Sequence, residues 1–198
     1  LTDMANYFSG FTLFRKGNYK EALKEFAKVK ESSPNYWPAR YATADAYYNL
    51  GQYPEAKWVY KTIITKGDTL FFFSAIDGLV WTYDKMNQPD EAVKELEALI
   101  DQIEEKNKKV VLLLKKGHLF YNKQQYTEAA LEYGRIINGY QGADQVNEAI
   151  YWSGWSWYQL KDYNTAREYF RDLFEHFPNS KFFDEANFLF GKILYEMK

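Results

Sequence analysis

Side chains that could support catalysis or metal binding are sparse in this sequence and form no recognisable motif. The two histidines, His118 and His176, lie in different repeats of the pattern described below, and neither has a second ligand at metal-binding spacing. The acidic residues Glu104 and Glu105 are adjacent, so their carboxylates point to different sides of a helix. The sequence contains no cysteine, no phosphate loop and no nucleophile elbow. We therefore expect a protein that is not an enzyme and that uses no metal and no cofactor.

Charge and hydropathy argue against two further classes of protein. The formal net charge is −2, which provides no electrostatic footprint for nucleic acid. The densest basic stretch, from Lys106 to Lys116, directly follows two glutamates and is typical of a solvated helix face. No apolar run approaches the ~20 residues that a membrane-spanning helix needs. We expect no nucleic-acid partner and no direct membrane insertion.

Aromatic residues are the unusual feature of the composition. They make up 20% of the chain, with 18 Tyr, 15 Phe and 6 Trp, whereas ordinary helical bundles fill their cores mainly with aliphatic residues. Aromatic side chains at helical spacing can complete a core, and Tyr and Trp are also the types that dominate binding hot spots. Which role applies depends on the elements that carry them.

Five segments of the chain share one pattern, in which an alanine is followed four positions later by a bulky residue. The alanines recur after 34, 36, 37 and 37 residues, in the pairs Ala22–Phe26, Ala56–Tyr60, Ala92–Leu96, Ala129–Tyr133 and Ala166–Phe170. Upstream of each alanine a small residue precedes a bulky one by three positions, in the pairs Gly10–Leu13, Ala44–Tyr47, Val80–Tyr83, Gly117–Phe120 and Gly154–Trp157. A sixth such pair is Gly191–Leu194. Small residues on facing helices let two backbones approach to the ~8–10 Å of close helix packing.

This pattern resembles the tetratricopeptide repeat family, and the resemblance covers essentially the whole chain. It implies an all-α, right-handed solenoid of about five helix-turn-helix repeats plus one terminal helix, forming a single unit over residues 1–198. The closing proline of the family pattern is present only as Pro34 and Pro178, and polar residues replace a usual large apolar one at Ser9, Thr43, Lys116 and Ser153. An irregular helical bundle predicts no fixed period, and the alanine spacing contradicts a coiled coil.

We expect repeats near 3–34, 37–68, 70–105, 107–141 and 144–178, followed by a terminal helix over 181–197. The expected helices cover residues 3–16, 19–32, 37–50, 54–66, 70–86, 89–105, 107–122, 126–138, 144–160, 163–176 and 181–197. Asn18 and Asp162 stand at N-cap positions, and Pro54 and Pro89 stand in first turns, where a missing N–H is tolerated.

The family resemblance also implies where a partner binds. Ligand-facing residues lie on the first helix of each repeat, three before, one after and four after the small position. These positions select an aromatic groove with an acidic patch, for which we predict the partner-binding residues Tyr7, Tyr41, Asp45, Tyr48, Asp77, Trp81, Tyr121, Tyr151, Trp155 and Tyr158. Phe188 and Lys192 occupy the same positions on the terminal helix. The alternative is that some of these aromatics only pack between neighbouring repeats.

We therefore expect a non-catalytic protein–protein interaction scaffold that binds an apolar or aromatic-rich peptide segment in its concave groove. The alternative function is a carrier or accessory module that holds a small hydrophobic ligand among the same aromatics. The charged residues in the lining favour the open peptide groove, because a sealed lipid pocket would leave charges unpaired.

The last two repeats resemble bacterial cell-envelope TPR proteins more specifically. The pattern runs from Ala166 through Phe170, Leu173 and the segment 177–180 to Gly191, as in the periplasmic partner of the Tol-Pal system and the TPR lipoprotein of outer-membrane barrel assembly. The resemblance implies a periplasmic or outer-membrane-associated location, with the cytoplasm as runner-up. The phenylalanine-rich helix at 181–197 also predicts self-association, or cover by a following helix.

Overall fold

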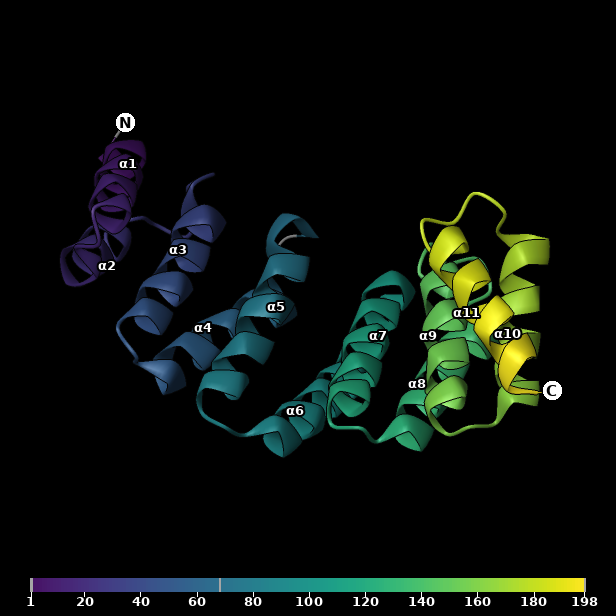
Figure 1. Ribbon diagram of the computed structural model, residues 1–198. Helices are drawn as coiled ribbons and strands as arrows, with labels where there is room; N and C mark the ends of the chain where they lie inside the picture. The colour runs from purple at the N-terminus through teal and green to yellow at the C-terminus, as the bar shows by residue number, and fades with distance from the viewer. Residues whose placement is uncertain (1, 68, 198) are drawn as a thin grey trace. The chain divides into compact units, whose positions relative to one another are not determined.

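The computed structural model describes residues 2–67 and 69–197, and within them the chain is all-α, with eleven helices and no strand (Figure 1). The helices are α1 (Thr2–Arg15), α2 (Tyr19–Phe26), α3 (Tyr36–Asn49), α4 (Tyr53–Lys66), α5 (Thr69–Lys85), α6 (Pro89–Gln102), α7 (Lys106–Asn122), α8 (Tyr126–Gly139), α9 (Val146–Gln159), α10 (Tyr163–His176) and α11 (Phe183–Glu196). The expected bounds at residues 1, 68 and 198 lie outside the described residues.

The chain divides into two compact units, one up to Lys94 and one from Glu95 onward. In the first unit each of the helices α1 to α5 packs on the next, and α3 also contacts both α1 and α5. In the second unit α7 to α11 pack in the same sequential manner. This consecutive antiparallel packing within each unit confirms the expected helix-turn-helix architecture (Figure 1). That residues 1–198 form one continuous solenoid stays a prediction.

All five turns between the first and second helix of a repeat have the same backbone geometry. The residue two positions before each second helix has a positive φ, at Gly17, Gly51, Asn87, Gln124 and Lys161. The following N–H returns to the carbonyl of the bulky residue, as in the bond from Gln125 to Phe120 (2.9 Å). A helix C-terminus of this kind satisfies carbonyl groups of the last helical turn that would otherwise lack a donor. The bulky residue of the repeat therefore supplies the carbonyl that closes the turn, two residues before each first helix ends.

In the first, fourth and fifth repeats, a glycine of the first helix faces an aromatic ring of the second helix. A Cβ at Gly117 would lie 2.4 Å from Tyr133 Cε1, and one at Gly154 would lie 2.7 Å from Phe170 Cε1. The alanines of the pattern are all buried, including Ala56 and Ala129 at 0% exposure. On α5 of the third repeat the close approach is made by Gly78 against Tyr60 of the preceding repeat, whereas Val80, which we expected at the small position, is half-buried.

One local expectation was wrong. The second helix ends at Phe26 instead of residue 32, because the N–H groups of Lys28 and Val29 turn back to carbonyls three residues earlier (3.1 Å each). This tighter turn buries Val29 in a cluster with Phe26 and Ala39. Asn18 and Asp162 are the N-cap residues of α2 and α10, as expected. The side chain of Asn18 makes no cap hydrogen bond, whereas Asp162 accepts from the Thr165 N–H at 3.1 Å.

Candidate partner-binding site

In the first unit, the predicted groove tyrosines pack against aromatic rings of their own repeat or of the next one. Tyr7 is half-buried against the core cluster around Phe26. The Tyr41 ring stacks on Phe71 of α5 at 5.5 Å, so it joins two neighbouring first helices. Tyr48 packs edge-on against the ring of Tyr53 at 5.7 Å. These rings stiffen the repeats, which corresponds to the packing alternative.

The acidic patch predicted in this unit is divided between different environments. Asp45 is partly buried and accepts a 2.5 Å hydrogen bond from the Tyr60 hydroxyl. Burial raises the pKa of the Asp45 carboxyl above its usual range, and the hydrogen bond from Tyr60 opposes that rise only in part. Asp77 is half-buried on α5, and Trp81, on the same helix, is 59% exposed. Trp81 therefore presents the largest free aromatic surface of the predicted set in this unit.

In the second unit, Tyr151 is the centre of a hydrogen-bonded cluster. It is 4% exposed, and its hydroxyl donates to Glu185 Oε2 (2.9 Å) and accepts from Trp155 Nε1 (2.6 Å). Its ring stacks on Phe182 at 4.6 Å. Burial raises the pKa of Tyr151 to about 12, so its hydroxyl stays a neutral donor. This cluster fixes the side chains of α9 against the start of α11.

A hollow of about 560 Å³ lies beside this cluster, between α9 and α11. Tyr151 and Trp155 form one side, Phe188 and Leu189 form the other, and the charged residues at the hollow are Asp184, Glu185 and Lys192. Phe188 is 73% exposed, so the hollow has an open aromatic edge. Tyr158 is linked to this group through Trp155 (ring centroids 5.6 Å apart) and through Lys192, whose amine lies 5.5 Å from the Tyr158 ring centroid.

Tyr121 is the remaining predicted residue, and it lies in the adjacent repeat. Its ring contacts Tyr126 and Trp152, each at about 5 Å, and its hydroxyl accepts a long bond from Gln159 (3.4 Å). The structure thus brings together Tyr151, Trp155 and Tyr158, and the second unit connects Tyr121 to them through Trp152. Sequence reasoning missed Asp184, Glu185 and Leu189, because they stand outside the three ligand-facing positions.

The repeats match known protein families at both ends of the chain. Family models described as tetratricopeptide repeats match residues 13–67 and residues 148–180. These two segments of the chain are tetratricopeptide repeats (TPRs). TPR proteins are a scaffold family that is typically non-catalytic and generally serves protein–protein interaction.

Solved TPR structures share the fold at low sequence identity. The chain is 22% identical to the C-terminal part of a TPR protein from Cytophaga hutchinsonii (TM-score 0.55), covering 87% of this chain and 65% of that one. A thermophilic TPR protein of Thermus thermophilus is 15% identical, covering 98% and 99% (TM-score 0.54). YrrB, a TPR protein described as having an unusual peptide-binding site, is 18% identical, covering 92% and 90% (TM-score 0.54). No curated protein gives a significant sequence match.

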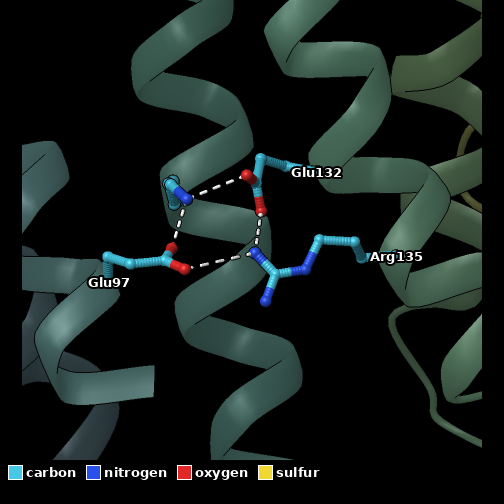
Figure 2. A network of polar contacts seen from close by, with 4 residues as sticks. Glu97, Glu132 and Arg135 are labelled. Atoms are coloured by element: carbon cyan, nitrogen blue, oxygen red, sulfur yellow. Dashed lines mark hydrogen bonds and ion pairs between the residues drawn. The ribbon is translucent and has the colours of Figure 1, made fainter. Parts of the chain in front are cut away.

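A buried charge network occupies one TPR position that is usually apolar. Lys116 is only 7% exposed, and its amine pairs with Glu132 Oε1 (2.8 Å) and with Glu97. Arg135 pairs with Glu132 (2.9 Å) and with Glu97 (3.6 Å), and Figure 2 shows how Glu97, Glu132 and Arg135 converge. Burial opposes ionisation of Glu97, but the two cations prevail and lower its pKa. The network joins α6, α7 and α8 and satisfies its own charges, so we assign it to repeat packing.

The histidines also have structural partners. His118 Nδ1 lies 2.8 Å from the Tyr133 hydroxyl, and His118 Nε2 lies 3.5 Å from Glu148 Oε1. The hydrogen bond with His118 lowers the pKa of Glu148, although burial opposes this effect. His176 pairs with Asp172 at 2.8 Å on the same helix. Within residues 2–67 and 69–197, no group of three or more potential metal ligands is assembled, and no helix has the length and hydropathy of a membrane span.

Proposed function

We propose that this TPR chain is an interaction scaffold whose first-helix face binds an apolar or aromatic-rich peptide segment. The observation that carries the proposal is the hollow between α9 and α11, because it lies at the predicted ligand-facing positions of two consecutive first helices. Its volume of about 560 Å³ is within the roughly 300–1,000 Å³ of ordinary ligand pockets.

The chemistry of the hollow favours a peptide over an isolated lipid. Trp155 and Phe188 offer large, rigid apolar area, while Glu185 and Lys192 offer a carboxylate and an amine for polar groups of the bound chain. A carrier site needs an enclosed cavity that hides most of its ligand. With Phe188 73% exposed, the hollow favours a segment that lays one apolar side chain into it and continues across the surface.

A peptide-display selection tests this proposal. A library of random 12-residue peptides is selected against the wild-type protein, and the enriched peptides are titrated against Phe188→Ala and Trp155→Ala. We expect enrichment of Trp, Phe, Tyr and Leu, and a loss of about 1–2 kcal/mol in binding for each variant. Phe188 is 73% exposed, so its removal leaves the fold intact.

Trp58→Ala is the matched control, because Trp58 is a 62% exposed tryptophan on the second helix α4. It should bind these apolar peptides as the wild type does. If Phe188→Ala and Trp155→Ala keep full affinity, the α9–α11 hollow is not the peptide site.

We also propose that α11 associates with a second copy of the chain. Leu194 is 44% exposed, Tyr195 is 75% exposed and Met197 is 39% exposed, which is a large apolar area for one helix end. Sedimentation velocity should detect a concentration-dependent dimer that Leu194→Glu abolishes. Leu131→Glu, at a 65% exposed leucine on α8, serves as the control and should leave the dimer intact. A wild-type monomer at all concentrations would refute this.

We also propose, from the resemblance to cell-envelope TPR proteins, that the protein is located in the periplasm or at the outer membrane. The 37-residue period and the motif from Ala166 to Gly191 support it. Fractionation of the source cells with an antibody against the chain should recover it with the envelope. Recovery only with the cytosol would overturn the assignment.

A further inference from the structure

Arg40 of α3 is a half-buried cation that pairs with no carboxylate among the described residues. Its guanidinium lies over the Trp58 ring, 5.4 Å from the ring centroid. Its Nε is buried and has no hydrogen-bond acceptor within the described part of the chain. A buried donor without an acceptor is costly, and a desolvated charge without a partner is more so. Nε itself is closed to other molecules, but the terminal nitrogens of the guanidinium are not among the buried atoms, so an acceptor on another molecule can pair with them.

Two adjoining hollows give such a molecule access to Arg40. The larger has a volume of about 660 Å³, and its walls include Trp37, Arg40, Trp58, Lys61 and Lys66. The smaller, of about 310 Å³, shares Arg40 and Trp58. Trp58 is 62% exposed, so one face of a tryptophan is open to solvent next to the guanidinium.

The charge of the larger hollow selects its ligand. Three basic residues, Arg40, Lys61 and Lys66, line it together with a single acidic residue, Glu31. A guanidinium can bind a carboxylate through two parallel hydrogen bonds and can at the same time contact an aromatic ring. Trp37 and Trp58 provide apolar area in the same hollow. The hollow therefore complements a carboxylate flanked by an apolar side chain.

This surface is distinct from the proposed peptide groove. Trp58, Lys61 and Lys66 lie on α4, a second helix that carries none of the predicted groove residues. Arg40 precedes the groove residue Tyr41 by one position, which places it about 100° around the helix. A ligand here would leave the first-helix face of the repeats unoccupied.

We propose that the α3–α4 hollow is a second binding site and that it takes an acidic segment of a partner protein. A carboxylate of the segment pairs with Arg40, and a neighbouring apolar side chain packs on Trp58. The amine of Lys66, on an exposed residue at the end of α4, adds a screened attraction for a further acidic residue.

The same random 12-residue display library tests this proposal separately from the first. Selection on the wild-type protein should enrich a second class of peptides, rich in Asp and Glu next to an apolar residue. These peptides should bind Arg40→Gln and Trp58→Ala about tenfold more weakly, as expected of a hot spot. Their affinity should also fall when the NaCl concentration is raised from about 50 mM to about 500 mM, because the screening length then shortens about threefold.

Phe188→Ala is the matched control and should bind the acidic class as the wild type does. Lys66→Glu, an exposed substitution that leaves the core untouched, gives a second readout and should also weaken the acidic class. Circular dichroism confirms that each variant is folded. The proposal is overturned if no acidic class is enriched, or if folded Arg40→Gln and Lys66→Glu both bind it with wild-type affinity.

Discussion

Adding one methyl group at Gly117 and at Gly191 compares the same repeat position with and without a facing second helix. A Cβ at Gly117 would lie 2.4 Å from Tyr133 Cε1, a distance that forces a neighbouring atom to move. A Cβ at Gly191 meets no described atom within 4 Å, beyond those of its own helix. Both glycines lie inside helices, so both substitutions gain the same helix propensity, roughly 1 kcal/mol for Gly→Ala.

The ring opposite Gly117 has little room to move. Tyr133 is 0% exposed, and its hydroxyl is tied to His118 Nδ1 at 2.8 Å. Overpacking a close-packed core costs about 1–3 kcal/mol. We therefore expect Gly191→Ala to raise the free energy of unfolding by up to about 1 kcal/mol. Gly117→Ala should lower it by up to about 2 kcal/mol, which is the overpacking cost less the propensity gain.

Urea denaturation followed by helical circular dichroism measures both changes. The difference between the two variants is the informative quantity, because the propensity gain cancels. If Gly117→Ala is as stable as Gly191→Ala, the tight contact between Gly117 and Tyr133 does not hold the fourth repeat together, and the reasoning fails.

Three further predictions concern charges and caps. Lys116→Ala should lower the free energy of unfolding by about 3 kcal/mol, because it removes the buried cation that pairs with the buried carboxylate of Glu132. Lys109→Ala should change it by less than about 0.5 kcal/mol. Asp162→Ala should cost about 1 kcal/mol through the lost cap, and Asn18→Ala much less, because Asn18 makes no cap bond. Wild type should exceed Glu97→Gln in stability at pH 7, because the pKa of Glu97 is lowered in the folded state. That advantage should shrink as the pH falls below 4.5 and disappear once it passes the folded pKa, and urea titrations at each pH will measure it.

The repeat architecture could be predicted from sequence because it depends on small residues at fixed positions. The period of Ala22, Ala56 and their counterparts indicates which faces of the helices approach closely, and all five alanines are buried. The turn geometry follows from the same register, since the carbonyl of the bulky residue closes the turn after each first helix. The repeat pattern did not predict where α2 ends, because a single packing contact competes there with continuation of the helix. The helix ends at Phe26, and Val29 is buried just after it.

The predicted site was harder to derive, because exposure depends on the neighbouring repeat. Tyr41 and Tyr151 occupy equivalent positions on their helices, but one stacks on Phe71 and the other is sealed by Phe182 and Glu185. Lys116 stands where an apolar residue is usual, and only the structure identifies the carboxylates that pair with it. Side-chain partners across repeats are not encoded in the spacing of any one repeat.

Site-specific photo-crosslinking tests the central claim most directly. A photoreactive phenylalanine analogue is placed at Phe188, beside the α9–α11 hollow, and, in a separate protein, at Leu131, which is 65% exposed on α8. Each protein is irradiated with an apolar peptide from the display selection, and the adducts are mapped by mass spectrometry. The account predicts peptide adducts from position 188 and none from position 131. Adducts from position 131 alone, or a bound peptide that never crosslinks at position 188, would contradict the assignment of this hollow as the partner-binding site.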